Sequence, residues 1–281
     1  MAANAPDIVC EKLTVGYDGH AVVSDMDFTL PAGQISVILG ASGCGKSTLL
    51  KHILRLHRPI SGRVLLGGHD MFSLSGKALH CLKQQIGVLF QDGALLGSLT
   101  LGDNVALPLR EHTRLKDKDI HKIVQAKLAL VGLEKFAAYY PNELSGGMRK
   151  RAGLARAMVM DPQMLFVDEP TSGLDPLNSA ELDQLLLEMK QHFNPTMVVV
   201  SHDLTSMRAV ADYVVVLGQG RTLYTGDKEA LERTEDPYLR RFLDREAEER
   251  ETPRLTEARL DPSMFKIDCS KHLAPGNADA R

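Results

Sequence analysis

At 281 residues, the chain is long enough to bury one sizeable α/β core together with a smaller subdomain. Its apolar content of 44% and charged content of 25% are ordinary for a globular protein, and a formal net charge of -3 excludes a strong overall field directed at nucleic acid or an anionic membrane. Four scattered cysteines without a Cys-x-x-Cys pair argue against zinc or a disulfide framework, and no apolar run approaches the roughly 18 residues that cross a bilayer.

The N-terminal part of the chain predicts a β layer followed by the start of an α/β sheet. Residues 1–7 lack the basic and apolar pattern of a signal peptide. Residues 8–33 alternate apolar and polar side chains, which predicts an antiparallel β subdomain. The apolar runs at 35–39 and 86–90 predict buried strands, and residues 46–56 between them have the pattern of a helix.

The middle of the chain is helical in pattern, and strands resume after it. Residues 93–160 contain helical stretches such as 117–131 and 146–160, so we expect an inserted α-helical subdomain at about 94–160. The apolar runs at 164–167, 197–200 and 213–217 predict three more strands. Because short strands alternate with helical stretches, the fold class is predicted to be α/β with a mixed, largely parallel core sheet.

Polar or glycine-rich groups follow four of the five predicted core strands. These are Gly40, Gln91, the pair Asp168-Glu169 and His202 with its two neighbours. Ligands of open α/β sheets bind at the carboxyl edge of the strands. The sequence therefore predicts a ligand site at this edge.

The last part of the chain, residues 245–281, differs in composition from the rest. It opens with a run of arginine and glutamate and then carries three prolines. Two interpretations are open: a solvated, partly disordered tail, or an arm that packs on a partner subunit. The apolar anchors of such an arm would be Leu260, Met264, Phe265 and Ile267. We expect one globular unit over residues 1–244 and a charged tail over 245–281.

Residues 40–47 fit the phosphate-loop pattern G-x-x-x-x-G-K-[ST], with a predicted strand before them and a helix after them. The glycines allow backbone N–H groups to point at phosphate oxygens, and the helix directs its positive dipole end at the same anion. Lys46 would reach the β- and γ-phosphates, and the Ser47 hydroxyl would bind Mg²⁺. A chance glycine-rich turn would not explain both flanking elements. The predicted nucleotide-binding residues of this loop are Gly40, Ser42, Gly43, Cys44, Gly45, Lys46, Ser47 and Thr48.

Two carboxylates, Asp168 and Glu169, follow the apolar run at 164–167. Asp168 would hold Mg²⁺, as in phosphate-loop enzymes generally. Glu169 would polarise the attacking water as a general base. A carboxylate pair at a strand end can also be a turn or a helix cap, and this alternative is weakened by the sequence that follows the pair.

The run Leu-Ser-Gly-Gly-Met at 144–148, placed between the phosphate loop and the acidic pair, resembles the signature of the ATP-binding-cassette (ABC) family. The sequence Glu-Pro-Thr-Ser-Gly-Leu-Asp at 169–175 is similar to the sequel that this family has. The resemblance covers residues 8–243 and implies a phosphate-loop (RecA-like) core that binds ATP and Mg²⁺ and hydrolyses ATP.

The resemblance also implies roles for single residues that would otherwise be unremarkable. His202 would hydrogen-bond the γ-phosphate and help to hold the attacking water. Gln91 would touch Mg²⁺ and link the site to a partner. Tyr17 would stack on adenine, and its alternative is a tyrosine packed in the β layer. The predicted catalytic residues are thus Glu169, His202, Gln91 and Lys46, and the predicted metal-binding residues are Ser47, Gln91 and Asp168.

The signature suggests an assembly state. Ser145, Gly146, Gly147 and Met148 begin a predicted helix, and a helix N-terminus with serine and glycines is an anion site by geometry. In the family, two chains form a head-to-tail homodimer around two ATP, and each site takes the signature from the other chain. Asp175 would meet the partner across that seam.

Finer similarities favour a transporter subunit. No coiled coil separates the phosphate loop from the signature, and the chain has one cassette, which argues against repair and translation ATPases. Residues 89–96, 104–113 and 240–244, together with Met148, resemble ATPases of MCE-associated phospholipid transporters, with Leu96 in place of a phenylalanine. Residues 171–175 have the form that is general in the ABC family, so they do not support the phospholipid-transport branch.

The resemblance implies a peripheral protein on the cytoplasmic face of the bacterial inner membrane. Its partners would be a second copy, a multi-span permease, an MCE-domain substrate-binding protein and a possible small regulatory subunit, without nucleic acid. Two alternatives stay open at this point: the ATPase of another importer or exporter, and a soluble ABC regulator or repair ATPase.

Overall fold

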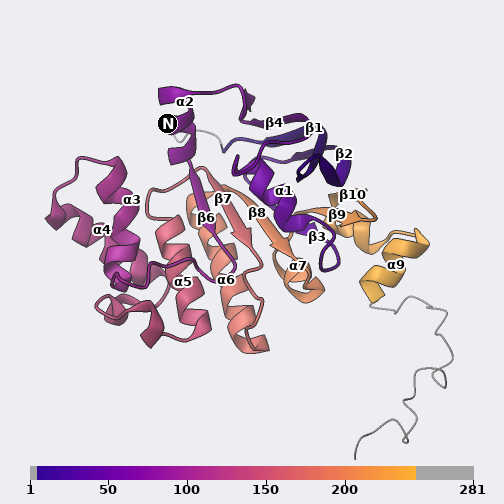
Figure 1. Ribbon diagram of the computed structural model, residues 1–281. Helices are drawn as coiled ribbons and strands as arrows, with labels where there is room; N and C mark the ends of the chain where they lie inside the picture. The colour runs from indigo at the N-terminus through magenta and orange to yellow at the C-terminus, as the bar shows by residue number, and fades with distance from the viewer. Residues whose placement is uncertain (1–4, 245–281) are drawn as a thin grey trace, which may run out of the picture.

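The computed structural model describes residues 5–244, which form two β-sheets with helices packed around them (Figure 1). The predicted tail at 245–281 and its apolar anchors lie outside the described residues. Within residues 5–244, no helix is long and apolar enough to cross a bilayer.

The core sheet has six strands, and its parallel part holds the strands that precede the predicted site residues. The five strands β9, β3, β8, β7 and β6 run parallel in this order, and β10 is antiparallel to β9 at one edge. The sheet is therefore mixed, as predicted. The strands are β3 (Ile35–Leu39), β6 (Ile86–Leu89), β7 (Met164–Asp168), β8 (Thr196–Ser201), β9 (Tyr213–Gly218) and β10 (Arg221–Asp227).

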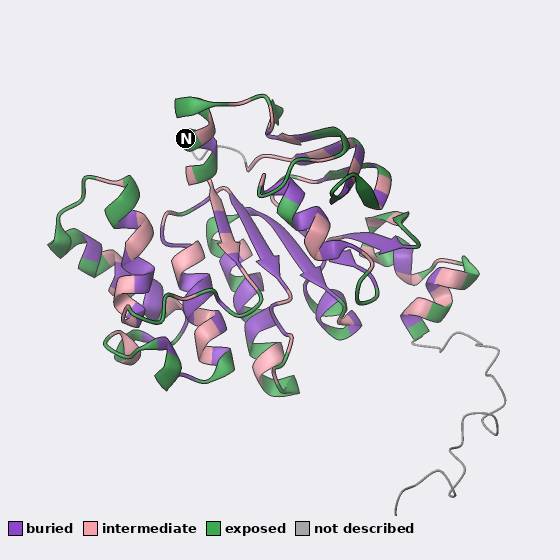
Figure 2. Ribbon diagram, viewed as in Figure 1, coloured by how far each residue is buried: buried purple, intermediate pink, exposed green. Residues whose placement is uncertain are grey.

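Apolar side chains cover both faces of the core sheet, which explains why its central strands are continuous apolar runs. Alternate residues of one strand point to opposite faces. In β7, Phe166 belongs to one apolar cluster, whereas Leu165 and Val167 belong to the other. Both clusters are fully buried at these positions, so the sheet is the middle layer of the molecule (Figure 2).

A second, smaller sheet of four antiparallel strands lies over one face of the core sheet. It confirms the antiparallel layer expected for residues 8–33 and adds two short strands that the sequence did not predict. Helix α1 (Lys46–Ile53) packs between the two sheets, where Leu49, Leu50 and Ile53 are buried. The four strands are β1 (Ile8–Tyr17), β2 (His20–Leu30), β4 (Ser61–Leu66) and β5 (His69–Asp70).

Helices cover the opposite face of the core sheet. The chain between β6 and β7 is helical, as expected for the inserted segment, and its helices pack on one another (Figure 1). It contains α3 (Leu101–His112), α4 (Asp117–Leu130), the short 3₁₀ turns Glu134–Phe136 and Pro141–Glu143, and α5 (Gly146–Ala157). The remaining helices are α2 (Gly76–Gln84), α6 (Pro176–Phe193), α7 (Leu204–Val210), α8 (Lys228–Glu232) and α9 (Pro237–Asp244).

Several predicted ends were wrong by a few residues. Helix α1 ends at Ile53 instead of residue 56, because Arg55 has a φ of 56° in the left-handed region. Helix α5 ends at Ala157 instead of residue 160, and strand β6 ends at Leu89. The α5 helix begins at Gly146, the first residue of the predicted stretch, although glycine is a poor helix former.

Candidate functional site

The order of the parallel strands places the predicted site segments next to one another. Strand β8 lies between β3 and β7. The phosphate loop follows β3, His202 follows β8, and Glu169 follows β7. Because the strands are parallel, their carboxyl ends share one edge of the sheet, and the three segments meet there. Gln91 follows β6, the next strand along, and lies in an exposed turn.

The phosphate loop leaves the N-terminus of α1 open for an anion. Gly45 is the cap residue of α1, and no side chain caps the helix. Its φ of 106° suits glycine, and a Cβ there would lie 2.4 Å from Val23 Cγ2. Lys46 is 6% exposed, and its Nζ donates to the carbonyl oxygens of Gly40 at 2.8 Å and Ala41 at 3.1 Å. The loop's own backbone thus fixes the ammonium at the open helix end.

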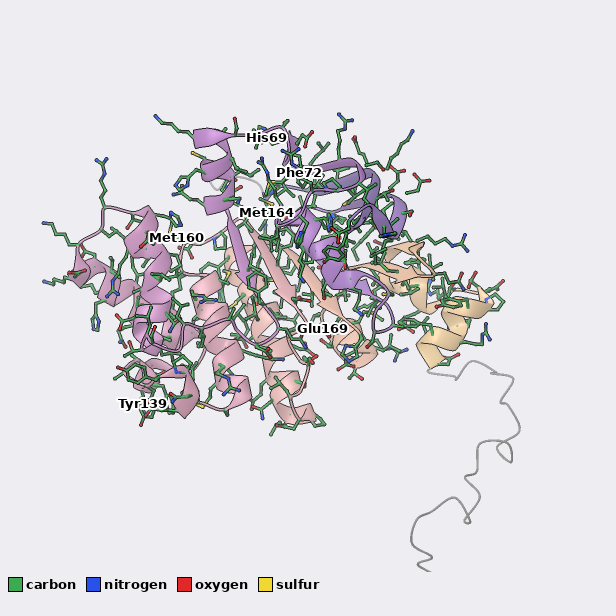
Figure 3. All side chains as sticks on the ribbon, in the orientation of Figure 1. His69, Phe72, Tyr139, Met160, Met164 and Glu169 are labelled. Carbon is green, nitrogen blue, oxygen red and sulfur yellow. The ribbon has the colours of Figure 1, made fainter. Side chains whose placement is uncertain are left out.

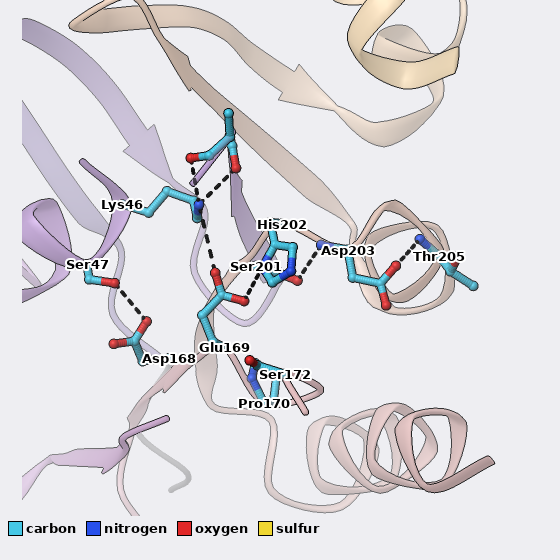
Figure 4. Close-up of polar contacts among 12 residues, drawn as sticks. Lys46, Ser47, Asp168, Glu169, Pro170, Ser172, Ser201, His202, Asp203 and Thr205 are labelled. Atoms are coloured by element: carbon cyan, nitrogen blue, oxygen red, sulfur yellow. Dashed lines mark hydrogen bonds and ion pairs between the residues drawn. The ribbon is translucent and has the colours of Figure 1, made fainter. Parts of the chain in front are cut away.

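Ser47 and Asp168 offer oxygen ligands to a metal. The Ser47 hydroxyl donates to Asp168 Oδ1 at 3.3 Å (Figure 4). Burial raises the pKa of the Asp168 carboxyl, and the hydrogen bond from Ser47 opposes this shift. Hydroxyl and carboxylate oxygens on adjacent elements match what Mg²⁺ prefers. The residues present therefore fit the metal, whereas the role of Gln91 in binding it stays a prediction.

Glu169, labelled among all the side chains in Figure 3, lies at the centre of the polar contacts drawn in Figure 4. Its carboxylate is 3.8 Å from Lys46 Nζ through Oε1 and 2.7 Å from His202 Nδ1 through Oε2. Its backbone has a φ of 48°, and its N–H donates to the carbonyl oxygen of Val200 at 2.9 Å. A left-handed conformation at a residue other than glycine costs about 1–3 kcal/mol, which points to a functional constraint.

The turn after β8 orients His202. The Asp203 N–H donates to Ser201 Oγ at 3.0 Å, and the Asp203 carboxylate caps α7 by accepting from the N–H of Thr205 at 2.8 Å. The His202 side chain remains 52% exposed while its ring contacts Glu169. Two of the predicted catalytic residues are thus in direct contact, and the contact of His202 with phosphate stays a prediction.

The signature forms the N-terminus of α5, on the opposite face of the core sheet from α1. Ser145 caps α5, and its Oγ accepts from the N–H of Met148 at 3.2 Å. The apolar side chains of α5 pack in the cluster on one face of the sheet, and those of α1 pack in the cluster on the other. The phosphate loop and the signature therefore begin helices on different faces of the sheet, and the role of both helix N-termini as anion sites stays a prediction.

The signature contacts the segment that carries Asp175. A Cβ on Gly147 would lie 3.4 Å from Asn178 Oδ1. Asp175 caps α6 by accepting from the N–H groups of Leu177 at 3.1 Å and Asn178 at 3.0 Å. The structure therefore brings the predicted seam residues Gly147 and Asp175 to neighbouring helix ends.

Tyr17 stands at the end of β1 with its ring 38% exposed. The Tyr17 ring makes edge contacts with two histidine rings. The distance between ring centroids is 5.1 Å to His57 and 6.0 Å to His52. His52 Nδ1 lies 2.7 Å from the carbonyl oxygen of Thr48, which links this ring cluster to the first turn of α1. The sequence did not single out either histidine, because no motif marks their spacing.

We expect Tyr17→Ala to weaken ATP binding by about 5- to 100-fold, because stacking on a base contributes about 1–3 kcal/mol. Binding is measured by calorimetry, with inorganic triphosphate as a competitor that lacks a base. Its affinity should not change. The matched control is Tyr139→Ala, which removes another exposed tyrosine. Equal losses for ATP and triphosphate would contradict a base-binding role.

Lys150 is a site residue that sequence reasoning missed. It lies on α5 and is 5% exposed, and its Nζ donates to the carbonyl oxygens of Glu169, Pro170 and Ser172. Burial lowers the pKa of this ammonium group. The run of basic residues after the signature was visible in the sequence, but no pattern indicated that this one turns inward.

The fold and the arrangement at the sheet edge define a phosphate-loop nucleotide-binding protein. The ABC transporter family model matches residues 23–172, and this chain belongs to that family.

Curated relatives include ATP-binding proteins of transport systems from several bacteria. The probable ribonucleotide transport ATP-binding protein mkl of Mycobacterium tuberculosis is 45% identical over 82% of this chain. The chain spans 64% of the length of that relative. The intermembrane phospholipid transport system ATP-binding protein MlaF of Haemophilus influenzae is 37% identical over 86% of this chain and 91% of its own length. MlaF of Escherichia coli is 38% identical over 86% of this chain and 89% of its own length.

Solved structures share the fold. CbiO1 of Clostridium perfringens, part of the ABC transporter complex cbiONQ, has a TM-score of 0.73 and 30% identity over 80% of this chain and 90% of its own. The ATP-binding cassette MJ0796 was solved as a dimer in a post-hydrolysis state with ADP and Pi. It has a TM-score of 0.72 and 29% identity over 78% of this chain and 98% of its own. The α/β phosphate-loop fold class is thereby confirmed.

Proposed function

We propose that this chain is the ATP-hydrolysing subunit of a phospholipid transporter that works with a membrane permease and an MCE-domain protein. The observation that carries the proposal is the similarity to the MlaF proteins over 91% and 89% of their length. The mkl relative is more similar in identity but extends well beyond the aligned part, which covers 64% of it. Residues 89–96 and 104–113, which resemble the lipid-transport branch, also support the proposal.

The proposed chemistry is positioning and charge neutralisation around the γ-phosphate of ATP. Lys46 and the N–H groups of residues 40–48 bind the phosphates, and Tyr17 stacks on adenine. Ser47 and Asp168 hold Mg²⁺, with Gln91 as a further ligand. When bound, Mg²⁺ neutralises charge on the β- and γ-phosphate oxygens.

Glu169 is the proposed general base, and His202 its neighbour in the site. The 2.7 Å contact between Glu169 Oε2 and His202 Nδ1 supports a shared task, because it fixes both side chains beside Lys46. Glu169 accepts a proton from the attacking water, and His202 helps to orient this water and hydrogen-bonds the γ-phosphate.

The proposed active form is a head-to-tail dimer around two ATP. Support comes from the separation of the two helix N-termini onto opposite faces of the core sheet, since one chain then offers two half-sites. Residues 145–148 of one copy complete the site of the other, and Asp175 lies at the seam. The dimer with ADP and Pi described for MJ0796 is consistent with this arrangement.

The proposed location is the cytoplasmic face of a bacterial inner membrane, held there by the permease. Residues 1–244 form the nucleotide-binding unit, including the helical part at about 94–160. In this proposal, residues 245–281, which lie outside the described residues, serve as an arm for a partner, and a small regulatory subunit is a further component.

The experiment that tests the proposal is a pull-down of the tagged chain from its native membranes in mild detergent. Mass spectrometry then identifies proteins and lipids, with membranes that carry the untagged chain as the control. We expect a multi-span permease, an MCE-domain protein and enriched phospholipid. A permease with a different substrate-binding protein, or recovery in the soluble fraction without a permease, would contradict the phospholipid proposal.

A further inference from the structure

A buried lysine joins the signature helix to the backbone of the proposed catalytic base. Lys150 lies in the second turn of α5, whose first residues are the signature glycines. Its Nζ reaches the segment that follows β7 and donates to the carbonyl oxygens of Pro170 at 2.7 Å, Ser172 at 2.5 Å and Glu169 at 3.2 Å. An ammonium group has three donors, so these contacts use its full capacity.

Burial of the Lys150 ammonium group costs free energy, which its hydrogen bonds must offset. Neutral carbonyl groups are the hydrogen-bond partners of Lys150. Burial lowers the pKa of its ammonium group, and the negative charges of Asp92 and Glu169 oppose this shift. Buried ammonium groups are expensive unless they are well compensated. The next residue of the same helix, Arg151, is only partly buried and forms an ion pair with the exposed Glu181 instead. The burial of Lys150 is therefore tied to its hydrogen bonds with these three carbonyl groups.

The carbonyl group of Glu169 helps to hold a residue whose backbone is strained. Glu169 has a left-handed φ of 48°, and its N–H is fixed by the carbonyl oxygen of Val200. On the other side of the same residue, the carbonyl oxygen accepts from Lys150 Nζ at 3.2 Å and from the Ser172 N–H at 3.3 Å, and both contacts fix that peptide. The direction of the Glu169 side chain depends on both anchors, since a rotation of either peptide would swing the carboxylate away from His202.

The same helix carries the groups that would face a second ATP. Ser145 caps α5, and Gly147 packs beside Asn178 at the start of α6. A helix transmits small displacements along its length because its backbone hydrogen bonds are continuous. Lys150 thus joins the second turn of α5 to the Glu169 segment by hydrogen bonds.

We propose that Lys150 is a positioning residue that fixes Glu169 and couples it to the signature helix, so that ATP bound at one copy's signature adjusts that copy's own catalytic base. This inference rests on the proposed ATP-dependent dimer. According to this proposal, the side chain of Lys150 carries the communication between the two ATP sites.

The test is Lys150→Met, which keeps much of the length of the side chain and removes its donors. We expect kcat for ATP hydrolysis to fall by about 10- to 100-fold, because a shift of the base by about 1 Å has an effect of this size. KM for ATP should change by less than about threefold, since the phosphate loop is untouched. The Hill coefficient for ATP should fall toward unity, a change that a purely structural role would not produce.

A matched control separates the proposal from a general loss of stability. Lys127→Met removes another buried lysine, which pairs with Asp161. It should lower the melting temperature in a similar way but leave the kcat and the Hill coefficient unchanged. Lys150→Arg, which retains a buried cation with several donors, should recover part of the kcat and of the cooperativity.

The outcomes are decisive in each direction. An unchanged kcat and Hill coefficient in Lys150→Met, or the same losses in Lys127→Met, would overturn the inference, as would a wild-type Hill coefficient of unity. If Lys150→Met does not fold, Lys150→Leu, which also has no donor, replaces it with the same criteria. A wild-type chain that neither binds nor hydrolyses ATP would instead contradict the proposed function.

Discussion

Glu169→Gln is expected to lower the rate of ATP hydrolysis by about 10²- to 10⁴-fold, the usual contribution of a general base. The amide has nearly the shape of the carboxylate but cannot accept a proton from water at neutral pH. It can keep a hydrogen bond to His202, which lies 2.7 Å from Glu169 Oε2 in the wild-type chain. ATP binding and ATP-dependent dimerisation should therefore persist while turnover stops.

Phosphate release at saturating ATP measures the turnover of this variant, and size-exclusion chromatography with and without ATP measures its dimerisation. The matched control is Glu188→Gln, the same chemical change at an exposed position on α6, where the carboxylate contacts Gln184. That variant should hydrolyse ATP like the wild type. Steady-state hydrolysis that persists in Glu169→Gln would contradict the role of Glu169 as the base.

The sequence predicted which segments form the site because each one follows a recognisable apolar strand. Gly40, Asp168 and His202 could be expected at one edge without knowledge of the strand order, since parallel strands bring their carboxyl ends together. The order itself, with β8 between β3 and β7, could not be read from the pattern. It is this order that places His202 beside Glu169.

Other features depend on tertiary contacts that leave no local pattern. Lys150 looks like the other basic residues of its helix, and only the packing of α5 against the chain after β7 turns it inward. His52 and His57 meet Tyr17 because β1 lies over α1. The early end of α1 follows from the left-handed Arg55, a conformation that side-chain periodicity does not reveal.

The affinity for ATP is expected to depend on Lys46, the charged residue of the phosphate loop. Lys46→Ala should raise the dissociation constant for ATP by about 10- to 100-fold, because a hydrogen bond to a charged group contributes about 1.5–3 kcal/mol. Lys46 is 6% exposed and is held by the carbonyl oxygens of Gly40 and Ala41. Its ammonium is therefore already oriented at the open N-terminus of α1, and no other residue of that loop carries a positive charge.

Calorimetry in the Glu169→Gln background gives this affinity without hydrolysis of the ligand. The control is Lys51→Ala, which removes an exposed charge from the same helix and should change the affinity by less than about threefold, since water and salt screen it. Loss of affinity in both variants would assign the effect to the general positive field of α1. Loss in Lys46→Ala alone, shared by ATP and inorganic triphosphate, would place Lys46 on the phosphates, because triphosphate has neither base nor sugar.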